Sequence, residues 1–598
     1  MIASARRAGR RVGRRVSVTW GRGMVWVARA GVDEQTLLLA FAAIVGAAAA
    51  LGTVAFYAAI DASYHLFFRW TSGDVPLFAR LAYRPMATAV AMGAAAALWR
   101  WSGRGGDGLT VPDVQLAVVR KGGFLPLGAA LGRTAASAVT IGGGGSAGAE
   151  GPVAVLGAAT GSWLSRVFRF SEGRTRVLVA SGTAAGISAA FNAPIAGAFF
   201  ALEEILGTFR GDHFAPVVVA SVIGAVISRG AFGDHPAFAL PQHYGYDHAL
   251  EVLWAFPLLG IVCGLMAVAF VRSHFAIAGA LSALRRRAVV RRVLPWVAGA
   301  VIGLSVALSR GLLVGTGHLA IPLTTFAEMT WWTLLVVAGG KMLITSLTLH
   351  GGGSGGVFTP SLYVGAALGS ALGLLLREVV PGFTSAPEAY ALVGMGAMVA
   401  ATTGAPITAA LLVFEISADY AIVAPLLVSV AISQALLRRV QGEDLYSGWL
   451  RRRGEAVVHG QDRRALETLH VREAYSPTSP VLSDAAPLSA VLALFSETAP
   501  ALVPVVDDEQ RLVGVLTSAE IGLLARTPEA MDARLLASDL AVPCETLTPD
   551  DSLAVAMRRM AVRGLGALPV VDAATDRVIG VLDRGHMLEL YDRAVSSR

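Results

Sequence analysis

The sequence predicts an all-α polytopic membrane protein, built from two inverted repeats with broken helices and followed by a pair of small α/β domains. Three observations predict this class. Hydrophobic residues make up 55% of the 598 residues and charged residues only 15%, whereas a soluble chain carries about 25% charged residues. Two glycine- and proline-containing motifs recur in the same order along the apolar region. The last part of the chain returns to ordinary soluble sequence and contains a repeat of its own.

Residues 1–35 form a basic tail. Eight arginines precede the first acidic residue, Asp33. Because cytoplasmic segments next to a membrane carry an excess of Lys and Arg, we interpret the tail as cytoplasmic. A nucleic-acid-binding arm is the alternative interpretation, and we expect no nucleic acid partner.

Residues 36–450 are expected to lie in the bilayer, in halves of about 36–250 and 251–450. A helix needs roughly 20 apolar residues to cross the hydrocarbon core. Apolar stretches recur throughout the region, for example at 36–59, 87–98, 253–271, 294–308 and 331–343. A β-barrel is disfavoured because strict alternation of apolar and polar residues is absent.

Two pairs of matching motifs identify the halves. Residues 146–152, SAGAEGP, match residues 354–360, SGGVFTP. Residues 193–204, APIAGAFFALEE, match residues 405–416, APITAALLVFEI. Two motifs in the same order at nearly the same spacing indicate a duplication, and transporters with such repeats bind their substrate where the repeats meet.

The first motif of each pair places a helix break inside the membrane, where irregular backbone is tolerated only if it lines a cavity or is buried in protein. A helix that restarts there presents unpaired N–H groups and the positive end of its dipole. Such an end binds an anion without a fixed cation. Helix starts at 148–152 and 356–360 therefore favour an anion over a metal ion or an amine. Glu150 is a lone acid in this place, and its role is the main question that the motif raises.

The remainder of the chain is expected to be soluble. A linker, 451–472, begins with the basic patch Arg451–Arg453, which we place on the cytoplasmic side. Residues 501–517 and 567–583 then each read as strand, turn and strand, followed by a helix. We expect one domain at 473–525 and a second at 537–594.

The sequence does not indicate an enzyme. Cys263 and Cys544 are the only cysteines, so a disulfide framework and a thiolate metal site are both implausible. No HExxH motif is present, and GGSAG at 144–148 resembles a serine-hydrolase elbow only weakly, without a preceding strand. We expect no catalytic residues, no metal and no required cofactor.

These motifs resemble those of the CLC family of chloride channels and proton-coupled anion exchangers, in the form that ends in a cytoplasmic tandem pair of CBS domains. Residues 148–152 are similar to the family motif G-x-E-G-P, 356–360 to G-x-F-x-P, and 445–447 to the final tyrosine motif. Residues 191–194 and 203–204 match as well. The likeness covers about 36–594.

The resemblance implies roles for individual residues. Glu150 would be the external gating glutamate, which occupies the anion site when ionised and swings away when protonated. Glu204 would be the internal proton-transfer residue, because this position is glutamate in exchangers and apolar in many channels. Glu203 would be a structural acid that bonds local backbone N–H groups. The implied anion-binding residues are Gly148, Gly356, Val357, Phe358 and Tyr446, with Thr110 as a candidate hydroxyl.

The resemblance also implies a function, antiport of protons against chloride or a similar small anion. The implied partners are chloride, protons and the lipid bilayer. The implied assembly is a homodimer with one pore per subunit in the plasma or inner membrane, with the N-terminus and the CBS domains in the cytoplasm. A passive voltage-gated chloride channel and an anion-responsive membrane sensor acting through the CBS pair stay open as alternatives.

Two departures from the family patterns affect these expectations. Where the family motif G-S-G-I-P supplies a serine, residues 108–112 read GLTVP, so that Leu109 takes the serine position. An adenosine nucleotide, if one binds the CBS pair, would use Thr517 and Glu520 of the first copy. The second copy has Asp583 at the hydroxyl position, and an acid there should repel phosphate. A plain dimerisation module without a ligand is the alternative for the pair.

Overall fold

A computed structural model describes most of the chain. The described residues are 34–69, 76–101, 109–233, 251–315, 326–381, 384–454, 469–477, 479–498, 500–517, 535–563, 565–587 and 589–590. They belong to two compact units, which divide at residues 457 and 458, inside the predicted linker. The basic tail, apart from its last two residues, and most of the linker lie outside the described residues.

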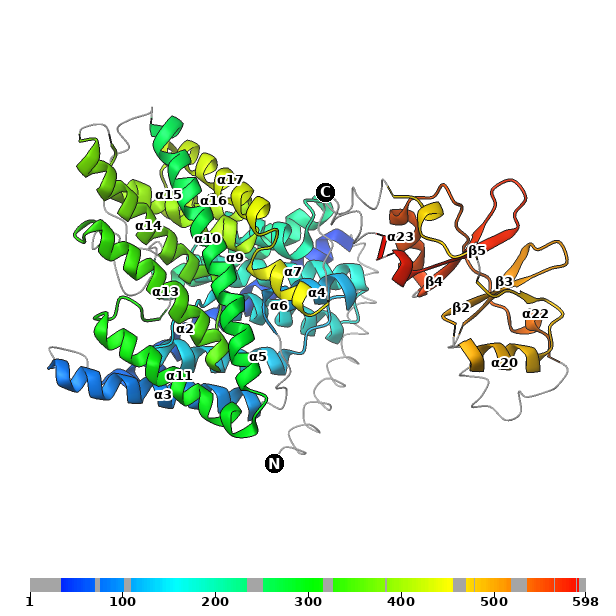
Figure 1. Ribbon diagram of the computed structural model, residues 1–598, viewed down its shortest axis with the longest axis horizontal. Coiled ribbons are helices and arrows are strands. Elements are labelled where there is room, and N and C mark those ends of the chain that lie inside the picture. The colour runs from blue at the N-terminus through cyan, green and yellow to red at the C-terminus, as the bar shows by residue number, and fades with distance from the viewer. Residues whose placement is uncertain are drawn as a thin grey trace. The chain divides into compact units, whose positions relative to one another are not determined.

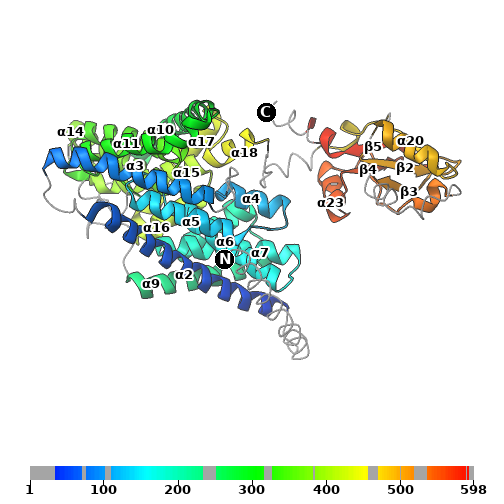
Figure 2. The same ribbon diagram turned by 90° about the horizontal axis from the view of Figure 1, so that it is seen from below.

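The membrane unit is built of helices (Figure 1). The first half contains α2 (Glu34–Phe68), α3 (Leu77–Trp101), α4 (Val111–Arg120), α5 (Leu127–Gly142), α6 (Glu150–Val167), α7 (Glu172–Phe191), α8 (Pro194–Phe200), η2 (Ala201–Leu206) and α9 (Gly211–Phe232). The second half contains α10 (Glu251–Leu284), α11 (Ala288–Leu308), α13 (Trp331–Gly351), α14 (Phe358–Val379), α15 (Pro387–Thr403), α16 (Pro406–Ser417), η3 (Tyr420–Ile422), α17 (Val423–Val440) and α18 (Leu445–Arg452). In the described part of the chain, seven helices are long and apolar enough to cross a membrane, which supports a multi-pass membrane protein. The halves pack on each other, with α3 beside α11 in both views (Figures 1 and 2).

The helices break where the motifs predict. α6 begins at Glu150 and α14 at Phe358, and α8 and α16 begin at Pro194 and Pro406. Proline suits a first helical turn because the N–H that it lacks would be unpaired there. After α8 the chain continues as the π-helical turn η2, whereas α16 has no such interruption. π-helical turns are rare and frequently mark functional sites.

Matching residues of the two halves bond each other in both directions. Gly148 N donates to Gly356 O at 2.7 Å, and Gly356 N donates to Gly148 O at 2.8 Å, in an antiparallel bridge. The two backbones pass each other in opposite directions here, and α6 and α14 start on either side. This arrangement confirms two inverted repeats. Further reciprocal bonds join Ser146 N to Thr348 Oγ1 at 3.2 Å and Ser354 N to Thr140 Oγ1 at 3.0 Å.

A second reciprocal pair joins the proline-led helices. Glu203 accepts from the N–H groups of Ile407 and Thr408, at 3.1 and 2.7 Å, in the first turn of α16. Glu415 accepts in return from two N–H groups in the first turn of α8, at 2.8 and 2.6 Å. Carboxylates are favourable at helix N-termini because of the unpaired N–H groups and the dipole. The expectation that Glu203 bonds local N–H groups is therefore wrong, because its partners belong to the other half.

The same close helix crossing occurs in each half. A Cβ at Gly157 would collide with the carbonyl oxygen of Gly182, and a Cβ at Gly182 would collide with that of Gly157. The matching residues Gly365 and Gly394, in α14 and α15, have the same relation. Close backbone approach through small residues is typical of helix packing in membranes. Each restarted helix is thus held against the helix that follows it.

The soluble unit contains the two predicted strand–turn–strand copies. β2 (Leu502–Val506) pairs antiparallel with β3 (Leu512–Thr517), and β4 (Ala567–Val571) with β5 (Val578–Asp583). β1 (Leu482–Ser483) joins β2 in parallel. The helices are η4 (Val471–Glu473), α20 (Leu488–Thr498), α22 (Ala537–Leu540) and α23 (Leu553–Arg563). The helix expected directly after β3 falls outside the described residues.

The two copies of the soluble unit pack against each other. Leu502 and Val515 of the first hairpin share one buried cluster with Ala567 and Val581 of the second. Val578 N also donates to the carbonyl oxygen of residue 510 at 3.0 Å. The copies therefore form one body with a shared apolar contact.

Candidate functional site

Gly148 and Gly356, predicted as anion ligands, use their N–H groups to bond each other. An N–H group that donates to a carbonyl is not free for an anion, so the structure corrects the expectation for these two residues. The first turn of a helix leaves N–H groups without intrahelical partners, and in α14 these begin at Phe358. A Cβ at Gly356 would come within 2.9 Å of Gly151 N. Glycine is therefore needed here for the close approach of the two backbones.

Glu150 opens α6 and is 2% exposed. Its carboxylate reaches across to the start of α14, where Oε2 accepts from Thr359 N at 3.3 Å and Oε1 accepts from the Thr359 hydroxyl. Gly148 leaves room for the carboxylate, because a Cβ there would collide with Glu150 Oε2. The carboxylate thus occupies the kind of place, a helix start with unpaired N–H groups, that binds anions.

Phe358 is held by two other aromatic rings. Its ring centroid lies 5.7 Å from that of Phe191 and 6.1 Å from that of Phe200. Both distances fall in the range of favourable aromatic pairs. These contacts fix the first residue of α14 and, with it, the direction of the N–H groups at the helix start.

Tyr446 lies in the first turn of α18. Asp444 caps this helix, and its Oδ1 accepts from Tyr446 N and Ser447 N, both at 2.8 Å. The Tyr446 side chain is buried. It lies within electrostatic reach of both Glu150 and Glu204. α18 therefore places the Tyr446 phenol where the charges of both Glu150 and Glu204 act on it.

Thr110 precedes α4 and caps it. Its hydroxyl donates to Asp113 Oδ2 at 2.6 Å, and its N–H donates to the same oxygen at 2.7 Å. Arg453 Nη1 lies 2.7 Å from the other carboxylate oxygen, Oδ1. A hydroxyl has one proton to donate, so Thr110 cannot also donate to an anion while it donates to Asp113. In this structure its side chain supports the loop rather than the anion.

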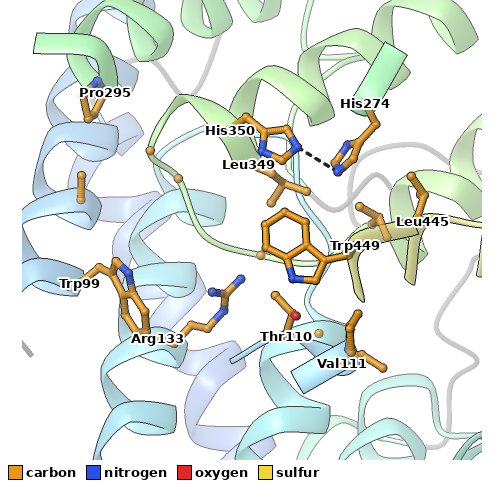
Figure 3. A pocket seen from close by; sticks show the side chains of 18 of the residues that line it. Trp99, Thr110, Val111, Arg133, His274, Pro295, Leu349, His350, Leu445 and Trp449 are labelled. Carbon is orange, nitrogen blue, oxygen red and sulfur yellow. Dashed lines mark hydrogen bonds between the residues drawn. The ribbon is translucent and has the colours of Figure 1, made fainter. Parts of the chain in front are cut away.

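A cavity of about 420 Å³ adjoins the helix starts (Figure 3). Thr110 and Val357 line it from the residues before α4 and α14, Val111 from the start of α4, and Tyr446 and Trp449 from α18. Figure 3 shows the Trp449 ring projecting into its middle. The structure thus gathers four predicted anion-binding residues at one cavity: Thr110, Gly356, Val357 and Tyr446. Gly148, Glu150 and Phe358 are not among its lining residues.

The lining of this cavity is basic. Among the described residues that line it there is no Asp or Glu, and there are four arginines: Arg100, Arg133, Arg285 and Arg291. The Arg133 guanidinium lies 5.7 Å from the centroid of the Trp99 ring and points toward the cavity (Figure 3). The cavity is also lined by His274 and His350, whose Nε2 atoms are 3.0 Å apart. A cleft lined by charge of one sign concentrates ions of the opposite sign, so this cavity attracts anions.

Glu204 lies in η2, away from the cavity lining, and is 7% exposed. The Gln115 amide donates to its carboxylate. Asp444 and Glu203 are the acids whose charges act on it. The matching position of the other half is Ile416, which is buried in α16.

In the soluble unit, Thr517 ends β3 and is buried. Glu520, its predicted companion, lies outside the described residues. Asp583 ends β5, and its carboxylate contacts the His586 ring and accepts from the His586 backbone N–H at 3.0 Å. Asp583, the acid that departs from the nucleotide-binding pattern, therefore bonds to a residue of the second copy itself.

Sequence reasoning missed three residues of the membrane site: Thr359, Gln115 and Arg133. Thr359 carried a usable signal, since it stands in the first turn after the second break and is the first hydroxyl there. Gln115 and Arg133 carried none, because each belongs to a helix that tertiary packing alone brings to the site.

Known proteins resemble this chain along both units. The family described as voltage gated chloride channel matches residues 88–438, and the CBS domain matches residues 471–521 and 537–593. The chain is 33% identical over 409 residues to a putative chloride channel protein, ClcB-like, of Ralstonia nicotianae, covering 66% of this chain and 91% of that protein. It is 32% identical over 309 residues to an H(+)/Cl(-) exchange transporter, ClcA, of Vibrio parahaemolyticus, covering 51% of this chain and 66% of that protein.

Solved structures are similar as well. A slow cyanobacterial Cl⁻/H⁺ antiporter is 25% identical with a TM-score of 0.63, over 71% of this chain and 98% of that chain. A eukaryotic CLC transporter is 18% identical with a TM-score of 0.68, over 93% of this chain and 99% of that chain, and this likeness concerns the fold. With the matched family, the inverted repeats and the basic cavity together, the chain belongs to the CLC family of chloride-transporting membrane proteins, in the form that ends in two CBS domains.

Proposed function

We propose that the chain is an antiporter that exchanges protons for chloride or a similar small anion. The observation that carries this proposal is the placement of Glu150, a buried carboxylate at the start of α6 that bonds to the start of α14. A neutral residue in its place would leave the helix start open to an anion at all times. A carboxylate frees the helix start when it takes up a proton, so one group can respond to both ions.

Glu150 is the proposed gate. Its ionised carboxylate competes with the anion for Thr359 N–H and the Thr359 hydroxyl, because charged acceptors form the stronger hydrogen bonds with such donors. A protonated Glu150 loses its charge, so the attraction of the helix start for it weakens and the side chain moves away. An anion then takes its place. Each proton taken up therefore opens the site to an anion.

The anion is proposed to reach this site through the arginine-lined cavity. The N–H groups at Val357 and Phe358 and the phenol of Tyr446 are the proposed ligands. Thr110 is excluded from this set as long as its hydroxyl donates to Asp113. With few side-chain ligands, we expect modest discrimination among chloride, bromide and nitrate.

Glu204 is proposed to pass protons between the cytoplasm and Glu150 on a route separate from that of the anion. A charge inside a membrane costs several kcal/mol unless it is used or solvated. The duplication does not require an acid at this position, since the other half has Ile416. A proton and an anion that move in opposite directions carry charge in the same sense. Transport must therefore be electrogenic and sensitive to voltage.

The test is reconstitution of the full chain in liposomes with a chloride gradient and a pH readout. We expect the gradient to drive protons uphill, and we expect Glu204→Gln to abolish proton movement while anion flux continues. A reversal potential that stays at the Nernst potential for chloride when the pH changes would identify a channel instead. Absence of any anion flux would identify a sensor.

The remaining parts of the proposal concern assembly and regulation. We propose a homodimer with one pore per subunit in the plasma or inner membrane. The basic residues at both ends of the membrane region favour a cytoplasmic location for the tail and the CBS pair. An adenosine nucleotide, where one binds, is proposed to use the first copy, with Thr517 and Glu520.

A further inference from the structure

Gln115 is a buried glutamine of α4 whose side chain contacts Glu204. It is 1% exposed. Its Nε2 lies 2.5 Å from Glu204 Oε1 and 3.0 Å from the main-chain oxygen of Glu204. Both partners are oxygens that accept hydrogen bonds, so the nitrogen of the amide faces them when Glu204 is ionised. One side chain therefore ties α4 to the π-helical turn that carries the proposed proton-transfer acid.

The other polar atom of the same amide is unpaired. Gln115 Oε1 is buried and makes no hydrogen bond to any described residue. Buried polar atoms are nearly always hydrogen-bonded, and each exception requires an explanation. A protonated Glu204 supplies one, because its hydroxyl needs an acceptor. A half-turn of the amide brings Oε1 to the position that Nε2 holds beside the ionised acid, and it exchanges the Nε2 bond to the Glu204 main-chain oxygen for the new bond from the Glu204 hydroxyl.

The surroundings of Glu204 explain why a neutral partner is useful there. Charged groups that act on Glu204 include Asp444, which precedes α18, and Glu203 beside it in η2. Tyr446 of α18 lies within electrostatic reach of Glu204. The one acid of α4, Asp113, is bound by Arg453 and Thr110. In the described part of the chain, α7, α8 and α9 also pack on η2.

Two neighbouring carboxylates repel an ionised Glu204, and an amide donor opposes this repulsion without adding a third acid. We propose that Gln115 is the positioning residue of the internal proton step. Its amide donates Nε2–H to the ionised Glu204 and, after a half-turn, accepts the proton of the neutral acid through Oε1. The side chain of Glu204 then keeps one position in both protonation states. This inference rests on the proposed antiport, in which Glu204 takes up and releases the proton.

The test compares Gln115→Leu, which removes donor and acceptor, with Gln115→Glu, which keeps the shape and the acceptor. Gln434 offers a matched control, because it is also a buried glutamine of the membrane unit and donates to a main-chain oxygen, Gly404 O, at 3.2 Å. We expect Gln115→Leu to lower proton flux about 10-fold, since a hydrogen bond to a charged group carries a free energy of that order. Anion flux should persist. Because the lost donor favoured the ionised acid, the half-maximal pH of proton flux should rise, and Gln434→Leu should change neither quantity.

A second readout does not depend on transport. The infrared carboxyl band that Glu204→Gln removes reports the protonation of Glu204 directly. We expect its titration to move to higher pH in Gln115→Leu and in Gln115→Glu. An unchanged titration in Gln115→Leu, or an equal shift in Gln434→Leu, would overturn the positioning role. If the titration moves but the wild type drives no protons uphill, Gln115 still sets the titration of Glu204, and it is the proposed antiport that has failed.

Discussion

The two halves of the membrane unit match each other in some contacts and differ in others. Gly148 and Gly356 exchange matching backbone bonds, and Glu203 and Glu415 each cap the proline-led helix of the other half through two N–H groups, with a third bond from the Thr408 hydroxyl to Glu203. The restart of the first half carries Glu150, however, where the restart of the second half carries Phe358. The shared positions hold the halves together, whereas the unshared position places a single charge at their meeting point.

The second difference lies at the proline-led helices. Glu204 stands in the π-helical turn η2, and the matching Ile416 stands in the uninterrupted helix α16. Both residues are buried. A duplicated fold therefore needs neither the acid nor the turn at this place, and the first half alone has both. Residues that break the symmetry are the ones to test for function, and residues that obey it are the ones to test for stability.

The largest effect is expected from Glu150→Gln. This change makes the first residue of α6 uncharged, like Phe358 at the start of α14. Proton movement driven by a chloride gradient should fall at least about 100-fold, which is the lower range for loss of a positioned acid–base group. Anion flux should persist, because the helix starts remain. Glu172→Gln is the control, since Glu172 is an exposed acid at the start of α7. Undiminished proton transport by Glu150→Gln would remove Glu150 from the gate.

Glu203→Gln and Glu415→Gln test the contacts that the halves share. Each variant weakens two hydrogen bonds from N–H groups to a carboxylate, for an expected loss of about 1–3 kcal/mol. Glu203 also accepts from the Thr408 hydroxyl at 2.7 Å, so the thermal unfolding midpoint should fall further in Glu203→Gln than in Glu415→Gln. Both variants should keep proton coupling. If Glu203→Gln lost proton coupling and Glu415→Gln kept it, Glu203 would have a role in proton transport in addition to capping α16.

A smaller effect is expected from Thr110→Val, which asks whether α4 acts on the anion or only supports its own loop. Loss of the hydrogen bond from this hydroxyl to Asp113 should lower stability by about 1 kcal/mol. The order of preference among chloride, bromide and nitrate should not change, because the hydroxyl donates to Asp113. Thr110→Ser should behave as the wild type. A strong chloride preference that disappears in Thr110→Val would place the hydroxyl on the anion.

The helix starts could be predicted from the sequence because glycine and proline break a helix wherever they stand in the chain. Whether an N–H group at such a start is free could not, since that depends on the backbone facing it. The two glycines were mistaken for ligands for this reason. Gln115 stands 89 residues from Glu204, and only the packing of α4 on η2 joins them. The local sequence pattern thus locates the helix breaks, whereas tertiary packing decides which N–H groups at those breaks remain free to bind an anion.

The comparison of repeats extends to the soluble unit, where each hairpin turn begins with an aspartate. In the first copy, Asp507 Oδ1 accepts from Arg511 N at 2.7 Å. In the second copy, Asp572 Oδ1 accepts from Ala574 N at 3.0 Å and from Thr575 N at 2.9 Å and Thr575 Oγ1 at 3.0 Å. The second turn is one residue longer, and its aspartate has more donors.

The smallest expected effect follows from this difference. The backbone N–H of Thr575, its hydroxyl and the N–H of Ala574 lower the pKa of Asp572 below its ordinary value. Asp572 therefore stabilises the folded unit above the unfolded-state pKa of about 3.9, and this contribution is lost as the pH falls through the lower folded-state value. Calorimetry of the full chain should show Asp572→Ala with a lower unfolding midpoint of the soluble unit at pH 7. The difference from the wild type should shrink toward pH 3, and Asp507→Ala should show a smaller difference at pH 7. Equal losses in the two copies, or a loss independent of pH, would mean that the extra donors of the second turn do not stabilise it.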